Sequence, residues 1–151
     1  MKVELKLINE VVFNESNLST IFNVARPRCY GILVNKDYSY KLGWQSEIVN
    51  PKINEISDNV YSIGIDLNFA IIDFEKGNVV LNLSLDYFFY DTKLQNGFIY
   101  VITELLIIKI NQMTYEVIEK FSLPDFFNEI IFNNNTIEIK CLNDEIVCYP
   151  N

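Results

Sequence analysis

Carboxylates are the reactive side chains that this sequence offers in quantity. The chain has no histidine, which excludes Ser-His-Asp triads, Cys-His pairs and histidine metal sites. An enzyme would then have to rely on carboxylates, lysine or cysteine, and paired carboxylates in unequal environments can catalyse glycoside hydrolysis. The candidates are Asp66, Asp73, Asp86, Asp91 and Glu104. None has a spacing that specifies a site, and Asp73, Asp86 and Asp125 fall at predicted strand ends, where carboxylates commonly accept turn amides. We therefore expect no enzyme activity.

Arginines and thiols offer a second chemistry. Arg26-Pro27-Arg28 holds both arginines and could grip a phosphate or carboxylate, but cations also suit the end of the helix expected before it. Cys29 follows directly, and nearby cations lower a thiol pKa, yet no general base or resolving cysteine accompanies it. Reduced thiols are expected, although Cys141 and Cys148 could pair if flanking strands bring them together.

Phosphate and metal sites have no support in the sequence. The five glycines form no phosphate-binding cluster. Asp66-Leu67-Asn68 lacks the remaining ligands and the glycine of a calcium loop. We expect no cofactor and no metal.

Aromatic residues gather in two places. Tyr38, Tyr40 and Trp44 alternate along one strand and form either core or a sugar-stacking platform. Tyr87-Phe88-Phe89-Tyr90, bracketed by Asp86 and Asp91, would place two rings on each face of a strand. Such a run is either a central strand buried on both sides or a docking surface for a cationic protein.

Charge narrows the choice of partner. Twelve basic and twenty acidic side chains give a net charge of −8 and a pI near 4.5, so nucleic-acid binding is excluded as the main function. Residues 1–60 are balanced, and the whole excess lies in residues 61–151. A basic protein is the natural complement.

The hydropathy pattern predicts a mainly β chain with one short N-terminal helix. Val3, Leu5 and Leu7 indicate a first strand, and Leu18, Ile21, Phe22 and Ala25 predict a helix over residues 14–25. Period-two alternation from Tyr30 to Trp44 predicts a hairpin or two strands. Residues 45–58, with Asn50-Pro51, form the predicted seam between a part over 1–57 and an acidic part over 58–151 of a single 1–151 domain.

Beyond the seam, the chain repeats itself. Turn residues separate regular apolar runs, which predicts consecutive antiparallel hairpins. Tyr61 aligns with Tyr100 at a shift of 39, and Leu83-Ser84-Leu85 aligns with Phe121-Ser122-Leu123 at a shift of 38. A third, truncated copy begins at Thr136. This period resembles β-propeller blades over residues 58–149, so we expect an incomplete propeller, a sandwich, or closure by a dimer.

The location predicted from the sequence is the cytoplasm. The first residues show no targeting segment, and the apolar stretch from Gly97 to Ile110 is interrupted by Glu104 and Lys109. We expect no membrane partner, and a monomer or weak homodimer.

In size, acidity, Asn- and Ile-rich composition and lack of catalytic groups, the chain is similar to immunity proteins of bacterial toxin systems, including contact-dependent growth inhibition. The resemblance implies tight binding to a cognate, cationic, nuclease-like toxin whose active site an acidic surface blocks. The contact residues expected from the sequence are Asp86, Tyr87, Tyr90, Asp91, Glu104, Glu116 and Glu119. The alternatives are a carbohydrate-binding module and a self-assembling β-scaffold subunit.

Overall fold

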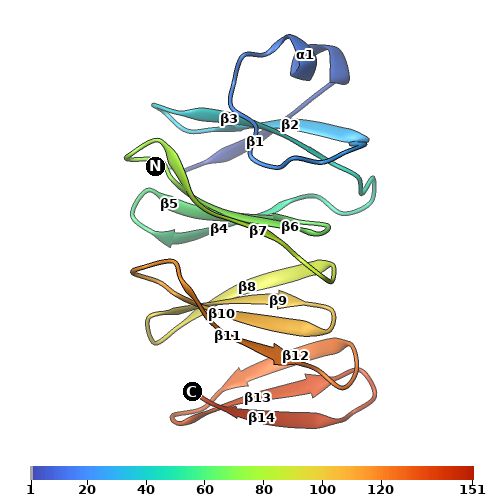
Figure 1. The fold of residues 1–151 in the computed structure, drawn as a ribbon, viewed down its shortest axis with the longest axis vertical. Coiled ribbons are helices and arrows are strands. Elements are labelled where there is room, and N and C mark those ends of the chain that lie inside the picture. The colour runs from blue at the N-terminus through green and yellow to red at the C-terminus, as the bar shows by residue number, and fades with distance from the viewer. Residues whose placement is uncertain (1) are drawn as a thin grey trace. The chain divides into compact units, whose positions relative to one another are not determined.

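The computed structural model describes residues 2–151 and shows a mainly β protein, 57% strand and 4% helix (Figure 1). The single helix, α1, spans Glu10–Glu15. The strands are β1 Glu4–Ile8, β2 Cys29–Val34, β3 Ser39–Trp44, β4 Lys52–Ser57, β5 Val60–Ile65, β6 Asn68–Asp73, β7 Asn78–Ser84, β8 Phe89–Gln95, β9 Phe98–Thr103, β10 Leu106–Asn111, β11 Val117–Ser122, β12 Phe127–Phe132, β13 Thr136–Cys141 and β14 Ile146–Pro150.

The strands form four antiparallel sheets, and each sheet is made of strands that follow one another in the sequence. Sheet I contains β1–β3, sheet II β4–β7, sheet III β8–β11 and sheet IV β12–β14. Such a meander is the construction of a propeller blade. The predicted period is confirmed, because β5 and β9 begin at Val60 and Phe98, and β7 and β11 begin at Asn78 and Val117.

The chain forms two compact units, the first ending at Asp86 and the second beginning at Tyr87. This division does not coincide with the seam expected over residues 45–58. Those residues include β4, which pairs with β5 in the middle of unit 1. Strand β4 is an outer strand of sheet II, and only Ile53 and Ile56 among its residues are apolar, so its apolar signal is weak.

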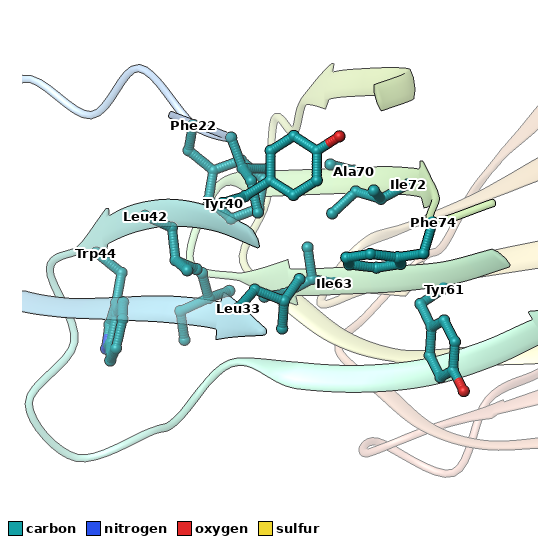
Figure 2. Close-up of a cluster of buried hydrophobic side chains, with 12 residues drawn as sticks. Phe22, Leu33, Tyr40, Leu42, Trp44, Tyr61, Ile63, Ala70, Ile72 and Phe74 are labelled. Atoms are coloured by element: carbon teal, nitrogen blue, oxygen red, sulfur yellow. The ribbon is translucent and has the colours of Figure 1, made fainter. Parts of the chain in front are cut away.

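In unit 1, the facing sides of sheets I and II enclose a core of large apolar side chains (Figure 2). Trp44 and Tyr40 from β3 lie in this core and are 1% and 6% exposed. Tyr40 and Tyr61 each contact Phe74 edge-on, with ring centroids 5.9 Å apart. Of the two alternatives for this strand, Tyr40 and Trp44 follow the core one, because buried rings cannot stack on a sugar; Tyr38 precedes β3 and is 40% exposed.

The helix predicted over residues 14–25 is wrong in position. Helix α1 ends before Ser16, and its N-cap Asn9 accepts a hydrogen bond from the Val12 N–H. The segment after it runs parallel to β3: the Ile21 N–H donates to the Lys41 carbonyl, and the Lys41 N–H donates to the Ser19 carbonyl. This edge pairing satisfies backbone groups that a helix would have used, and it buries Ile21 in the core.

Helix α1 packs on the side of sheet I that faces away from the core. The Phe13 ring lies 4.9 Å from the ring of Tyr30, and the Lys41 amine lies 4.6 Å from the Phe13 centroid. Lys41 also donates to the Phe13 and Ser16 carbonyls at the helix end. Val3 and Leu5 pack on the core as the first-strand pattern predicts, whereas Leu7 is 68% exposed.

In unit 2, sheets III and IV enclose a second core around the fully buried Tyr100 and Ile139. The central strands β9 and β10 are buried almost throughout. Strand β13 instead alternates, with Ile137, Ile139 and Cys141 buried and the residues between them more exposed. The helix of the described residues is too short to cross a membrane.

Candidate functional site

Exposed aromatic and aliphatic side chains gather at one loop end of unit 2. This end carries the segment before β8, the β9–β10 turn, the segment before β12 and the β13–β14 turn. We call it the aromatic end, and define it by Tyr87, Phe88, Tyr90, Phe126 and Leu142, which are 39%, 53%, 49%, 46% and 62% exposed.

The sequence predicted that the whole run Tyr87–Tyr90 lies in one strand, but only its second half does. Strand β8 begins only at Phe89, so Tyr87 and Phe88 lie in the preceding loop. The Phe88 carbonyl there accepts a hydrogen bond of 3.1 Å from the Glu104 N–H. This bond fixes the loop against the β9–β10 turn, and the loop presents both rings to solvent rather than to the two faces of a sheet.

Tyr90 is displayed by a β-bulge. In the pairing of β8 with β9, Phe89 lies opposite Thr103 and Asp91 opposite Ile102, which leaves Tyr90 as the extra residue. Bulges redirect side chains and often border binding sites. The Tyr90 ring packs on the buried Phe127, with centroids 5.2 Å apart. The ring is therefore held against Phe127 while the residue stays 49% exposed.

Phe126 and Leu142 belong to the same surface but were missed by the sequence analysis. The Leu142 N–H donates to the Phe126 carbonyl at 2.8 Å, and the Phe127 N–H donates to the Glu104 carbonyl at 2.8 Å. These bonds join the three loops into one framework. The available signal was an apolar residue inside each of two polar turn segments, Pro124-Asp125-Phe126 and Leu142-Asn143-Asp144.

Carboxylates outnumber amines around the aromatic end. Asp91, Glu104, Asp125, Asp144 and Glu145 lie in or beside its loops, with Lys93 and Lys140 as the neighbouring cations. Each lysine already pairs with a carboxylate: Lys93 with Asp91 at 3.4 Å and Lys140 with Asp144 at 3.5 Å. The surface therefore has a net negative charge next to exposed rings.

Some of these carboxylates also organise the loops. One Asp125 oxygen accepts the Asn143 N–H at 3.0 Å, and Glu145 accepts from the Asn143 side-chain amide at 2.8 Å. In unit 1, Asp73 accepts the Glu75 and Lys76 N–H groups, and Asp66 accepts the N–H groups of Gln45 and Ser46. The turn role predicted for Asp73 and Asp125 is confirmed.

The sequence-predicted contact residues divide into two groups. Tyr87, Tyr90, Asp91 and Glu104 lie at or beside the aromatic end, and Asp86, the last residue of unit 1, directly precedes Tyr87. Glu116 does not lie at the aromatic end, because its carbonyl accepts the Asn111 N–H at the opposite end of unit 2. Glu119 lies within β11 opposite Lys109, and its charge adds to burial in raising the pKa of Tyr100.

Cys29 and Arg28 line the same cavity in unit 1. Burial raises the pKa of the Cys29 thiol, and the nearby carboxylates of Glu47 and Asp66 raise it further, which is the reverse of activation. Arg28 lines a cavity of about 450 Å³ in unit 1, beside Cys29 and Glu47, and does not follow a helix. Within residues 2–151, no cluster of three potential ligands could hold a metal.

Cys141 and Cys148 do not pair. Both are free thiols; Cys141 is buried on the core side of sheet IV and Cys148 is exposed. The register places Cys148 opposite Glu138, three residues from Cys141 along β13. The two thiols therefore lie on opposite faces of the same sheet.

Comparison with known proteins supports the fold. No protein-family model and no curated protein matches the chain. The solved structure of Sqt1 from Saccharomyces cerevisiae matches 97% of this chain with a TM-score of 0.54 and 13% identity. The computationally designed protein Ika4 matches 90% with a TM-score of 0.54 and 11% identity.

The likeness is one of fold alone. The structural neighbours are β-propeller-like, and each of the four sheets has the meander topology of a blade. The chain spans 45% of Sqt1 and 94% of Ika4.

Proposed function

We propose that the chain is a binding protein for a cationic protein partner, which docks on the aromatic end of unit 2. The observation that carries this proposal is the group of exposed apolar side chains on hydrogen-bonded loops, bordered by an excess of carboxylates. Aromatic rings anchor protein interfaces because they bury a large area with few rotatable bonds. The proposal gives the chain no catalytic role and no cofactor.

The Tyr90 ring and the loops that carry the other anchors are held in place before binding. Tyr90 rests on Phe127, and the Phe88 and Phe126 carbonyls are both hydrogen-bonded to neighbouring loops. A surface that loses little conformational freedom on binding retains more of its contact energy as affinity. The carboxylates at the border speed encounter with a positively charged partner and disfavour an anionic one.

We further propose that this partner is a bacterial toxin of the nuclease class, and that the chain acts as its immunity protein in the cytoplasm. Nucleases present cationic surfaces to phosphates, and an acidic protein can occupy that surface. The net charge of −8 and the similarity in size and composition to immunity proteins support this choice.

The test is a quantitative affinity capture from the native lysate at low salt with three baits. These are the wild-type protein, Phe88→Ser/Tyr90→Ser, and the control Met113→Ser, whose side chain is 85% exposed at the opposite end of unit 2. We expect one basic protein at stoichiometric yield on the wild-type and control baits, and a loss of at least about tenfold on the aromatic variant. Added salt should weaken this capture.

The purified partner then tests the inhibitory role. Its nuclease activity should fall to the background level when wild-type protein is added, and should persist with Phe88→Ser/Tyr90→Ser. Equal capture by all three baits would refute the assignment of the site. A partner that is acidic, or whose activity is unaffected, would refute the toxin assignment.

A further inference from the structure

Unit 1 contains a cavity of about 450 Å³ at one end of sheet I. It lies where β1 and β3 end and β2 begins, and residues of the β3–β4 loop complete its lining. Cavities of about 300–1,000 Å³ are typical of sites for small molecules. The function proposed above uses unit 2 and gives this cavity no role.

Two aromatic side chains, Tyr30 and Trp44, form what we call the aromatic wall of the cavity. The Tyr30 hydroxyl donates to the Pro27 carbonyl at 3.1 Å. Trp44 lies opposite Cys29 in the pairing of β2 with β3 and is 1% exposed. The Cys29 thiol in turn donates to the Ser46 carbonyl of the β3–β4 loop at 3.4 Å. The aromatic wall is therefore held in position before a ligand binds.

The end of β1 adds an aliphatic side to the cavity. Leu7 and Ile8 belong to the lining. Of the alternating residues Val3, Leu5 and Leu7, the first two pack on the core, whereas Leu7 is 68% exposed. An exposed apolar side chain at a cavity gains free energy when an apolar group of a ligand covers it.

Three charged side chains also line the cavity: Arg28, Glu10 and Glu47. None of them forms an ion pair with another residue of the described range 2–151. Both carboxylates lie near the wall of the cavity. Burial raises the pKa of Cys29 and the Glu47 charge raises it further, and burial and the Glu10 charge raise the pKa of Tyr30 in the same way. The cavity therefore combines one cation with two anions that are available to a ligand.

A small ligand with charges of both signs fits this lining. An anion alone would be repelled by Glu10 and Glu47, and a cation alone would be repelled by Arg28. We propose that the cavity binds a free α-amino acid with an apolar side chain. The Arg28 guanidinium holds the α-carboxylate through paired hydrogen bonds. The carboxylates of Glu10 and Glu47 hold the ammonium group, and the apolar side chain packs on Leu7 and the aromatic wall.

Trp44 provides a direct readout, because it is the only tryptophan of the chain and lines the cavity. Titration of the full protein with L-leucine should change the Trp44 fluorescence saturably, and calorimetry should give the same dissociation constant. L-Leucinamide lacks the carboxylate, and N-acetyl-L-leucine lacks the ammonium group. Each should bind at least about tenfold more weakly than leucine, because each leaves a charge of the cavity without its partner.

Substitutions should remove these preferences one at a time. Arg28→Gln should weaken leucine binding at least about tenfold but should not weaken leucinamide binding, because the amide has no carboxylate for Arg28 to hold. Glu10→Gln/Glu47→Gln should weaken the binding of leucine but not of N-acetyl-leucine. The control Arg26→Gln removes an exposed arginine that does not line the cavity, and should bind leucine like the wild type. Because all four side chains are exposed, urea unfolding should show wild-type stability for each variant.

Three results would refute the proposal. The first is the absence of a saturable response to leucine up to millimolar concentrations. The second is equal affinity for leucine and leucinamide, which would indicate a site for cations. The third is equal affinity for leucine and N-acetyl-leucine, which would indicate a site for anions. The partner site is tested separately, because Phe88→Ser/Tyr90→Ser should bind leucine like the wild type and Arg28→Gln should capture the same protein partner.

Discussion

The two loop ends of unit 2 use their residues for different purposes. We call the other loop end, which carries the β8–β9, β10–β11 and β12–β13 turns, the polar end. There, Asn96 and Gly97 both have positive φ, at 50° and 80°, as a tight hairpin turn requires. The Asn111 side chain accepts the N–H groups of Met113 and Thr114 in the next turn. Asn96, Gly97 and Asn111 therefore each have a local structural reason, although Met113 in the same turn is 85% exposed.

At the aromatic end, the exposed side chains lack such a reason. No turn geometry requires a phenylalanine at 88 or 126, or a leucine at 142, and the backbone bonds made by these residues would form with any side chain. Apolar groups that neither shape the loop nor enter the core are the usual sign of a binding surface. The contrast between the ends therefore separates residues that make the fold from residues available for a partner.

The largest expected difference in stability is between substitutions of two adjacent residues at the aromatic end. Phe127→Ala should lower the free energy of unfolding by about 3–5 kcal/mol, because Phe127 is 8% exposed and belongs to the core of unit 2. Phe126→Ala, one residue earlier and 46% exposed, should change it by less than about 0.5 kcal/mol. Urea unfolding followed by circular dichroism measures both; equal losses would show that Phe126 is part of the core.

The fold was largely predictable from sequence because turns and alternation are local signals. Turns rich in asparagine and glycine, together with apolar runs, indicated the hairpins and the period of the repeat. The alignment of Tyr61 with Tyr100 within the repeat was wrong by one residue. Tyr61 pairs with Ile72 in β6 and Ile99 with Ile110 in β10, so Ile99 is the equivalent of Tyr61. A shift of one residue places a side chain on the opposite face of a strand. The match between two tyrosines in the sequence could not reveal this shift.

The site was only partly predictable, because it is assembled from loops that are distant in sequence. The run from Tyr87 to Tyr90 could be recognised from its composition, whereas Phe126 and Leu142 are joined to this end only by tertiary hydrogen bonds. Charge could not show that Glu116 lies at the other end of unit 2 from the aromatic residues, since acidity says nothing about which end of a sheet a residue occupies. The predicted helix failed for a similar reason: helical spacing at Ile21 did not reveal that the edge of β3 would pair with this segment.

A substitution at the polar end should have an intermediate effect on the free energy of unfolding. Gly97→Val should destabilise the protein by about 1–2 kcal/mol, because a β-branched residue strongly disfavours positive φ. A steric clash is not the cause, since a Cβ atom on Gly97 would meet nothing within 4 Å. Gly97→Asn should cost less, as asparagine tolerates this conformation. Equal stability of the two variants in urea unfolding would contradict the backbone explanation.

The smallest expected effect tests the aromatic end itself. Phe88→Ser/Leu142→Ser removes two side chains that are 53% and 62% exposed, and should change the free energy of unfolding by no more than about 0.5 kcal/mol per site. The control is Met113→Ser at the polar end, which should behave alike in urea unfolding. If both variants keep wild-type stability while only the first loses partner binding, the apolar residues of this end serve recognition. A loss above about 1 kcal/mol per site would instead assign them a structural role and remove the distinction between the two ends.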